Sequence, residues 1–182
     1  MDRINSSPFH RFQGWRLVAL IIVFGLYTYW FIGQGYFGQM TRIDGHVSLQ
    51  GRGFYSGATA VEILGRLDAA GQKAKYLALI FDVPYMIMQA LVFEGLIAFG
   101  MRHMKPQNPK WNYLFILPIG FLLADFAEDS FIALTLATAS QALGTIAGFM
   151  TAFKFLIFYP AIAVSTVMVI GGLTAWVRQN RA

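Results

Sequence analysis

The sequence contains no cysteine, and only 13% of its 182 residues are charged. The lack of cysteine excludes disulfides, thiolate metal sites and cysteine nucleophiles. A soluble domain usually has about a quarter of its residues charged, whereas here 57% of the residues are hydrophobic. This composition is typical of an integral membrane protein.

Recognisable cofactor and catalytic motifs are also missing. The histidines, at positions 10, 46 and 103, all fall outside the apolar runs, so an intramembrane haem would have no pair of axial ligands. There is no H-E-x-x-H motif, no nucleophile elbow and no phosphate-binding loop. We therefore expect no cofactor and no metal site. The net charge of +5 comes from basic residues scattered near the ends of apolar runs, which indicates membrane topology and not a nucleic-acid partner.

The apolar runs predict an all-α fold, an integral membrane four-helix bundle that forms a single domain over residues 1–182. The expected spans are residues 15–33, 76–101, 111–137 and 149–177, each long enough to cross a bilayer. The first run is too long for a signal peptide and no small-residue cleavage site follows it, so we expect it to be retained. Four tryptophans lie near the expected span ends, as in an interfacial aromatic belt: Trp15, Trp30, Trp111 and Trp176.

The distribution of lysine and arginine predicts the orientation. Basic residues are concentrated in the N-terminal tail, in the loop at 102–110 and in the C-terminal tail, whereas residues 138–148 carry none. The positive-inside rule then places both termini in the cytoplasm, in a bacterial inner membrane, with residues 34–75 as a long outer loop.

That outer loop divides into two parts. Its first half is rich in glycine, so we expect little regular structure there. Its second half opens with Ser56, a plausible N-cap, and apolar residues such as Ala60 and Leu64 then recur at helical spacing as far as Gly71. This predicts a short amphipathic helix on the membrane surface or across the mouth of the bundle. An ordinary surface helix is the alternative.

The candidate site lies within the expected spans. Asp125, Glu128 and Asp129 lie on one face of the third span, because they are three or four residues apart. Ionisable groups inside an apolar span normally face the bundle interior and have partners there. Lys154 lies in the fourth span, at a similar depth toward the outer side. The residues expected to form one binding or proton network are Asp82, Tyr85, Gln89, Asp125, Glu128, Asp129 and Lys154.

The charges of this network do not balance. Four carboxylates accompany one lysine, and burial and mutual repulsion both oppose ionisation of so many acids. Some acids are then protonated, or water reaches them, or a cation or an outer-loop arginine (Arg52 or Arg66) joins them. Networks of this kind also serve only to fix helix packing, and that structural role is the competing interpretation.

Part of the chain resembles a known family. The run from Tyr55-Ser56 through Leu67, Gly71 and Asp82-x-Pro84, followed by Asp125-x-x-Glu128, is similar to a family of small uncharacterised bacterial four-span membrane proteins. The resemblance covers residues 54–136 and implies four spans with an acid pair in the third, but no established activity. The sequence departs from the family pattern at Phe54, Asp68, Gln72, Tyr76 and Asp129. The last departure adds a charge to the acid pair, because Asp129 stands where the family has asparagine.

Three classes of function fit these patterns. The first is a membrane module that binds or translocates protons, cations or a small amphiphile through the acidic network. The second is a non-catalytic accessory subunit, whose partners are the lipid bilayer and other membrane-protein subunits. The third is a lipid-modifying enzyme that uses buried carboxylates, although no nucleophile supports it and no catalytic residue is predicted.

Overall fold

The computed structural model describes residues 14–39 and 49–181, and every regular element within them is helical. The longer helices are α1 (Trp15–Thr28), α3 (Gly57–Gly65), α4 (Ala69–Met104), α5 (Ile116–Thr138) and α6 (Gln141–Arg181). The all-α prediction is therefore confirmed for the described part of the chain. Within it, the helical stretches Trp15–Gln39, Ala69–Met104 and Gln141–Arg181 are long and apolar enough to cross a membrane.

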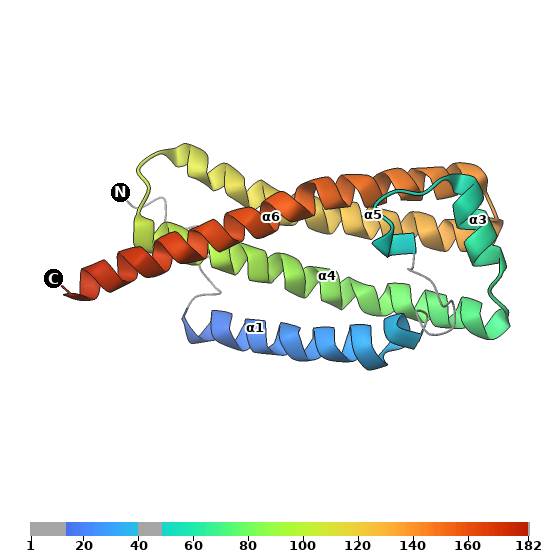
Figure 1. Ribbon diagram of the computed structural model, residues 1–182, viewed down its shortest axis with the longest axis horizontal. Coiled ribbons are helices and arrows are strands. Elements are labelled where there is room, and N and C mark those ends of the chain that lie inside the picture. The colour runs from blue at the N-terminus through green and yellow to red at the C-terminus, as the bar shows by residue number, and fades with distance from the viewer. Residues whose placement is uncertain (1–13, 40–48, 182) are drawn as a thin grey trace.

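Helices α1, α4, α5 and α6 run side by side along one axis (Figure 1). Helix α4 packs on both α5 and α6, and α1 packs chiefly on α4. The short helix α3 lies across one end of the bundle, against α5 and α6. Helix α1 begins and α6 ends at the opposite end (Figure 1). Beyond α1 the helix widens into a π-helical stretch, Tyr29–Gln34, and the segment Leu49–Gly51 forms a single 3-10 turn.

Helix α4 begins at Ala69, seven residues before the predicted span. The side chain of Asp68 accepts a hydrogen bond from the backbone N–H of Gly71, at 2.7 Å, and so caps the first turn. The helical pattern that was expected to continue from Ser56 to Gly71 is consequently divided, because α3 ends at Gly65. The segment predicted as outer loop is shorter by the same seven residues.

Helices α5 and α6 also differ from the predicted spans. Helix α6 begins at Gln141 instead of residue 149, so the connection predicted at 138–148 is reduced to Ala139 and Ser140. Ala139 ends α5 in the left-handed conformation, with φ of 52°. Helix α5 begins five residues late, because Pro109–Phe115 forms 3-10 turns before it. The predictions for residues 1–13 and 40–48, including those for His10 and His46, lie outside the described residues.

Glycines allow α3 to approach α6 closely. A Cβ atom at Gly148 would collide with the backbone carbonyl oxygen of Tyr55, and one at Gly57 would collide with that of Gln141. Gly144, one turn before Gly148, lies against Ala60 and Gly57. Small residues four apart let helix backbones meet in this way within membrane proteins. The contact fixes the segment from Tyr55 to α3 against the end of the bundle.

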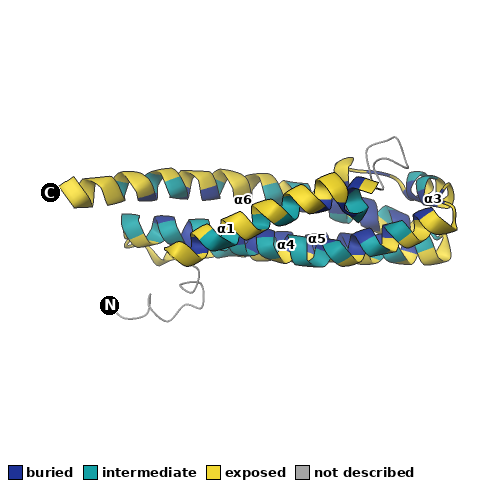
Figure 2. Ribbon diagram, turned by 90° about the horizontal axis from the view of Figure 1, so that it is seen from below, coloured by how far each residue is buried: buried dark blue, intermediate teal, exposed yellow. Residues whose placement is uncertain are grey.

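Exposed surface is concentrated along α1 and the C-terminal half of α6 (Figure 2). Much of this surface is apolar, as at Leu26 and Ile170, which are 67% and 61% exposed. An apolar exterior with polar groups inside is compatible with insertion into a bilayer. The four tryptophans are all on the outside, at 38% to 75% exposure.

Candidate functional site

Three helices bring ionisable residues to the same level of the bundle. Asp82 lies thirteen residues after the start of α4, Asp125 thirteen before the end of α5, and Lys154 thirteen after the start of α6. At 1.5 Å per residue, each is about 20 Å from the end of the bundle that carries α3. All three side chains are buried, at 4% to 8% exposure.

Lys154 is the centre of one half of the site. Its Nζ lies 2.9 Å from Asp125 Oδ1 and also forms an ion pair with Glu128 Oε2. The other oxygen of Glu128 accepts a hydrogen bond from the Thr151 hydroxyl, at 2.6 Å. Glu128 is fully buried, so its charge depends on these two contacts, the hydrogen bond to Oε1 and the ion pair at Oε2.

Gln50 and Lys75 form the other half of the site, and neither was predicted. The side-chain amide of Gln50 donates to Asp82 Oδ2 at 3.0 Å and to Asp129 Oδ1 at 2.6 Å. Its carbonyl oxygen accepts a hydrogen bond from Lys75 Nζ at 3.0 Å. The neutral amide thus connects a buried ammonium group to two buried carboxylates. Arg66, proposed as a partner for these acids, instead pairs with Glu62 on the exposed face of α3.

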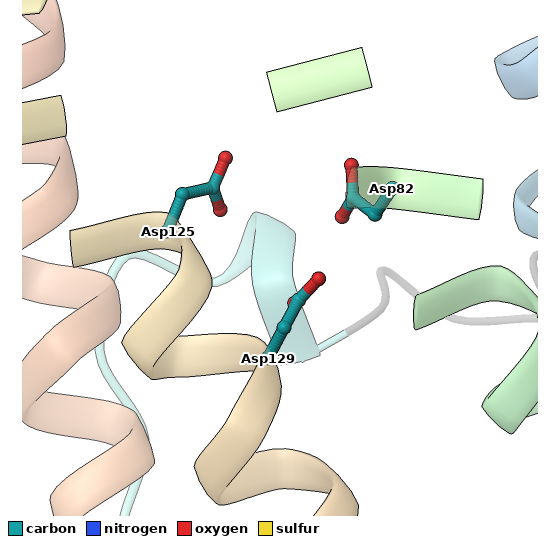
Figure 3. A group of neighbouring side chains, drawn as sticks. All are labelled: Asp82, Asp125 and Asp129. Carbon is teal, nitrogen blue, oxygen red and sulfur yellow. The ribbon is translucent and has the colours of Figure 1, made fainter. Parts of the chain in front are cut away.

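Three aspartates converge at the junction of the two halves. Asp125 and Asp129 extend from α5 toward Asp82 of α4 (Figure 3), and oxygens of the three lie within 4.8 Å of one another. This spacing alone would suit a metal ion. However, the amide nitrogen of Gln50 already bonds to two of the three carboxylates, and Lys154 bonds to the other. We therefore assign no metal site to these residues.

A cavity of about 180 Å³ adjoins the network and is partly open to the surroundings. Its polar lining comes from Gln50, Asp82, Gln89, Asp125 and Lys154. Its remaining walls are mainly aromatic, from Phe31, Phe37, Tyr85, Phe121, Phe155 and Phe158. For comparison, an engineered apolar cavity of about 150 Å³ holds one benzene molecule. The cavity therefore has room for a small ligand or for part of a larger one.

The structure brings together all seven residues that the sequence analysis grouped. Five of them line the cavity, and Glu128 and Asp129 lie behind that lining, bonded to Lys154 and Gln50. Lys75 was not predicted because it precedes the apolar run and was assigned to the outer loop. Lys75, Asp82 and Gln89 are spaced by seven, so recognising Asp68 as a helix cap would have placed Lys75 on their face. Gln50 lies in an irregular segment, where no periodic signal exists.

Tyr55 lies beside the network, at its end nearest α3. It is 3% exposed and follows the Leu49–Gly51 turn. Burial raises the pKa of its phenol well above the usual range, and the opposing influence of the Thr151 hydroxyl and of Lys154 is smaller. Tyr55 is therefore a neutral neighbour of the charged groups.

Comparison with known proteins finds no matching family model, no matching curated protein and no matching solved structure.

Proposed function

We propose that this protein is a membrane-embedded binding module in which the carboxylate–lysine network takes up and releases a proton beside the aromatic cavity. The observation that carries this proposal is the imbalance of charge in a buried site. Four carboxylates (Asp82, Asp125, Glu128 and Asp129) accompany two lysines (Lys75 and Lys154), so the fully ionised network has a surplus of two negative charges. Such a surplus favours proton uptake by one or more carboxylates.

The hydrogen bonds indicate which half of the network takes up the proton. Lys154 contacts Asp125 and Glu128 directly, whereas among the described residues Asp82 and Asp129 accept side-chain hydrogen bonds from the neutral amide of Gln50 alone. The second oxygen of Asp129 is buried and has no hydrogen-bond partner among the described residues. Protonation of Asp82 or Asp129 would let one acid donate to another. Asp82 also lines the cavity, which gives the proton a connection to the surroundings.

The proposal includes a specific arrangement in the membrane. Helix α5 is about 35 Å long at 1.5 Å per residue, enough for a fourth span. Its three carboxylates are buried against α4 and α6, so they need not face lipid. Six basic residues lie at the end where α1 begins and α6 ends, which favours a cytoplasmic location for that end: Arg16, Arg102, Lys105, Lys110, Arg178 and Arg181. The exposed apolar surface would then contact the lipid of a bacterial inner membrane.

Proton uptake by the lipid-reconstituted protein tests the proposal. A pH-indicator dye in weakly buffered solution reports the protons bound after a drop from pH 8 to pH 5. We expect Asp82→Asn to bind fewer protons than the wild type while it keeps the same near-ultraviolet circular dichroism. The control variant is Asp82→Glu, which keeps a carboxyl at this position and should retain the uptake. Equal uptake by wild type and Asp82→Asn would contradict the proposal.

A further inference from the structure

The aromatic cavity beside Asp82 provides the chemistry that recognises organic ammonium ions. Cations are attracted to the faces of aromatic rings, and six of the residues that line this cavity are aromatic. Carboxylates add a charge of opposite sign, and here Asp82 and Asp125 both line the same cavity. Ligand pockets with mainly aromatic walls and a few polar groups are typical of small-molecule sites.

The protein already places one ammonium group in this environment. Lys154 Nζ lies 5.6 Å from the centre of the Phe155 ring while it pairs with Asp125 and Glu128. The ion pairs with Asp125 and Glu128 hold Lys154 on the α5–α6 side of the site. Asp82 comes from α4 and has no direct ion pair with either lysine among the described contacts. A carboxylate without a cation of its own is therefore available at the cavity wall.

We propose that the cavity binds a small organic ammonium ion that carries an apolar substituent. The positive charge of this ion lies beside Asp82, so the ion competes with a proton for the Asp82 carboxylate. This inference rests on the proposed function, since it assigns a ligand class to the same site. The cavity lining carries two carboxylates and one lysine, so an anionic amphiphile would meet a surplus of negative charge. A neutral amphiphile would gain only the apolar contacts.

The cavity also suits such a ligand in size and position. Its volume of about 180 Å³ accommodates one aromatic ring or one quaternary ammonium group. Ile32, which lines it from the π-helical stretch after α1, is 47% exposed. The apolar substituent can therefore extend past α1 toward the apolar exterior.

The charges around Asp82 determine how the affinity depends on pH. At high pH Asp82 is ionised and attracts the ammonium ion. At low pH a proton occupies the carboxylate and the ligand loses that attraction, by up to tenfold per pH unit for a single competing proton. The titratable groups that face Asp82 are Lys75 and Tyr85 of α4, Asp125 and Asp129 of α5, Lys154 of α6 and Tyr27 of α1.

Equilibrium binding of benzyltrimethylammonium, whose charge does not change with pH, tests the inference. Titration calorimetry in nanodiscs of phosphatidylglycerol should give saturable binding that weakens at least tenfold between pH 8 and pH 5. Neopentylbenzene has the same shape with carbon in place of nitrogen, and it should fail to compete for the site. The source of the ligand is tested at equal surface charge, by replacing half of the phosphatidylglycerol either with phosphatidylcholine or with an uncharged glycolipid. Weaker apparent binding with phosphatidylcholine than with the glycolipid would show that lipid headgroups occupy the same ammonium site, and equal binding would show that the site takes free ammonium ions.

Two variants and a control connect the binding to these residues. Asp82→Asn should weaken binding at pH 8 at least tenfold and abolish its dependence on pH. Phe158→Leu should weaken binding roughly two- to fivefold, through loss of a ring that contacts the cation. Phe126→Leu is the control, because Phe126 is 54% exposed on α5 and does not line the cavity. It should bind as the wild type does.

The outcomes separate this inference from the proposed function. Absence of saturable binding, equal binding of neopentylbenzene, or unchanged affinity in Asp82→Asn would overturn the ammonium site. If Asp82-dependent proton uptake persists in any of these cases, the proposed function stands and only the ligand class is wrong. If proton uptake is also independent of Asp82, both are wrong.

Discussion

Replacement of Lys154 by methionine should destabilise the protein far more than removal of an exposed lysine or arginine would. Lys154 forms ion pairs with Asp125 and Glu128, and the side chains of the three residues are between 0% and 10% exposed. Removing one partner of a buried pair leaves uncompensated charge and typically costs about 3–5 kcal/mol. We therefore expect the free energy of unfolding of Lys154→Met to fall by about this amount at pH 8.

The exposed pair on α3 provides a matched control. Arg66 and Glu62 form an i, i+4 ion pair, but their side chains are 62% and 61% exposed. Such pairs contribute about 0.3–0.5 kcal/mol, so Arg66→Met should cost roughly a tenth of what Lys154→Met costs. Equilibrium unfolding in mixed micelles with an increasing fraction of denaturing detergent measures both values.

The pH dependence of that cost tests the reasoning further. Without Lys154, the carboxylates Asp125 and Glu128 repel each other, and protonation of either one relieves that repulsion. The destabilisation should therefore be largest at pH 8 and should shrink as the pH falls toward 5. The double variant Lys154→Met/Asp125→Asn should regain part of the lost stability. A cost for Lys154→Met no greater than that for Arg66→Met, or a cost that grows as the pH falls, would refute this reasoning.

Three further predictions concern the parts of the chain that surround the network. Gly148→Ala should destabilise the protein by about 1–3 kcal/mol, because its Cβ would meet the Tyr55 carbonyl, whereas Gly25→Ala has open space and should be neutral or slightly stabilising in the same unfolding assay. Gln50→Leu should lower the free energy of unfolding by about 1–3 kcal/mol, because it removes the hydrogen bonds of Gln50 to the buried side chains of Asp82 and Lys75. The control Gln107→Leu replaces an exposed glutamine and should have little effect. Burial raises the pKa of Tyr55, so in an ultraviolet titration its tyrosinate signal should appear only above the usual tyrosine range near pH 10, and Tyr55→Phe should remove that signal. The free energy of unfolding should decline above pH 10, because there the Tyr55 phenol ionises readily only in the unfolded chain.

The central part of the site could be predicted from the sequence because helical periodicity determines it. Asp125 and Asp129 are four residues apart, and ionisable groups in an apolar helix must face other helices. The same reasoning placed Asp82 and Lys154 opposite them. Their grouping needed only the helix repeat and the approximate depth of each residue.

The remaining half of the site depends on contacts that periodicity does not encode. Gln50 reaches the carboxylates from a single 3-10 turn that belongs to none of the long helices. Lys75 was missed because hydropathy places the start of the span at Tyr76, whereas the cap at Asp68 places the start of the helix at Ala69. The helix extends beyond the apolar run, so hydropathy alone underestimates its length. The imbalance of four carboxylates against one lysine thereby becomes four against two.

The cavity was also beyond the reach of sequence analysis. Its aromatic residues come from the π-helical stretch Tyr29–Gln34, from α4, α5 and α6, and from the segment around Phe37. Each of these residues alone is an ordinary apolar position in the sequence. Their convergence depends on how α1 rests on α4. The hydrogen bond from the Tyr27 hydroxyl to the Phe81 carbonyl, at 2.7 Å, and the ring contacts of Tyr85 with Phe24 and Phe31 help to set that position.

Infrared difference spectroscopy tests most directly whether the buried network exchanges a proton. The carbonyl stretch of a protonated carboxyl group is distinct from the bands of a carboxylate, so lowering the pH of lipid-reconstituted protein reveals each acid that takes up a proton. We predict that the wild type develops a carbonyl band between pH 8 and pH 5 that is absent from Asp82→Asn. If the spectra of the wild type and Asp82→Asn develop identical bands over this range, Asp82 does not exchange a proton, and the proposed proton uptake beside the cavity is contradicted.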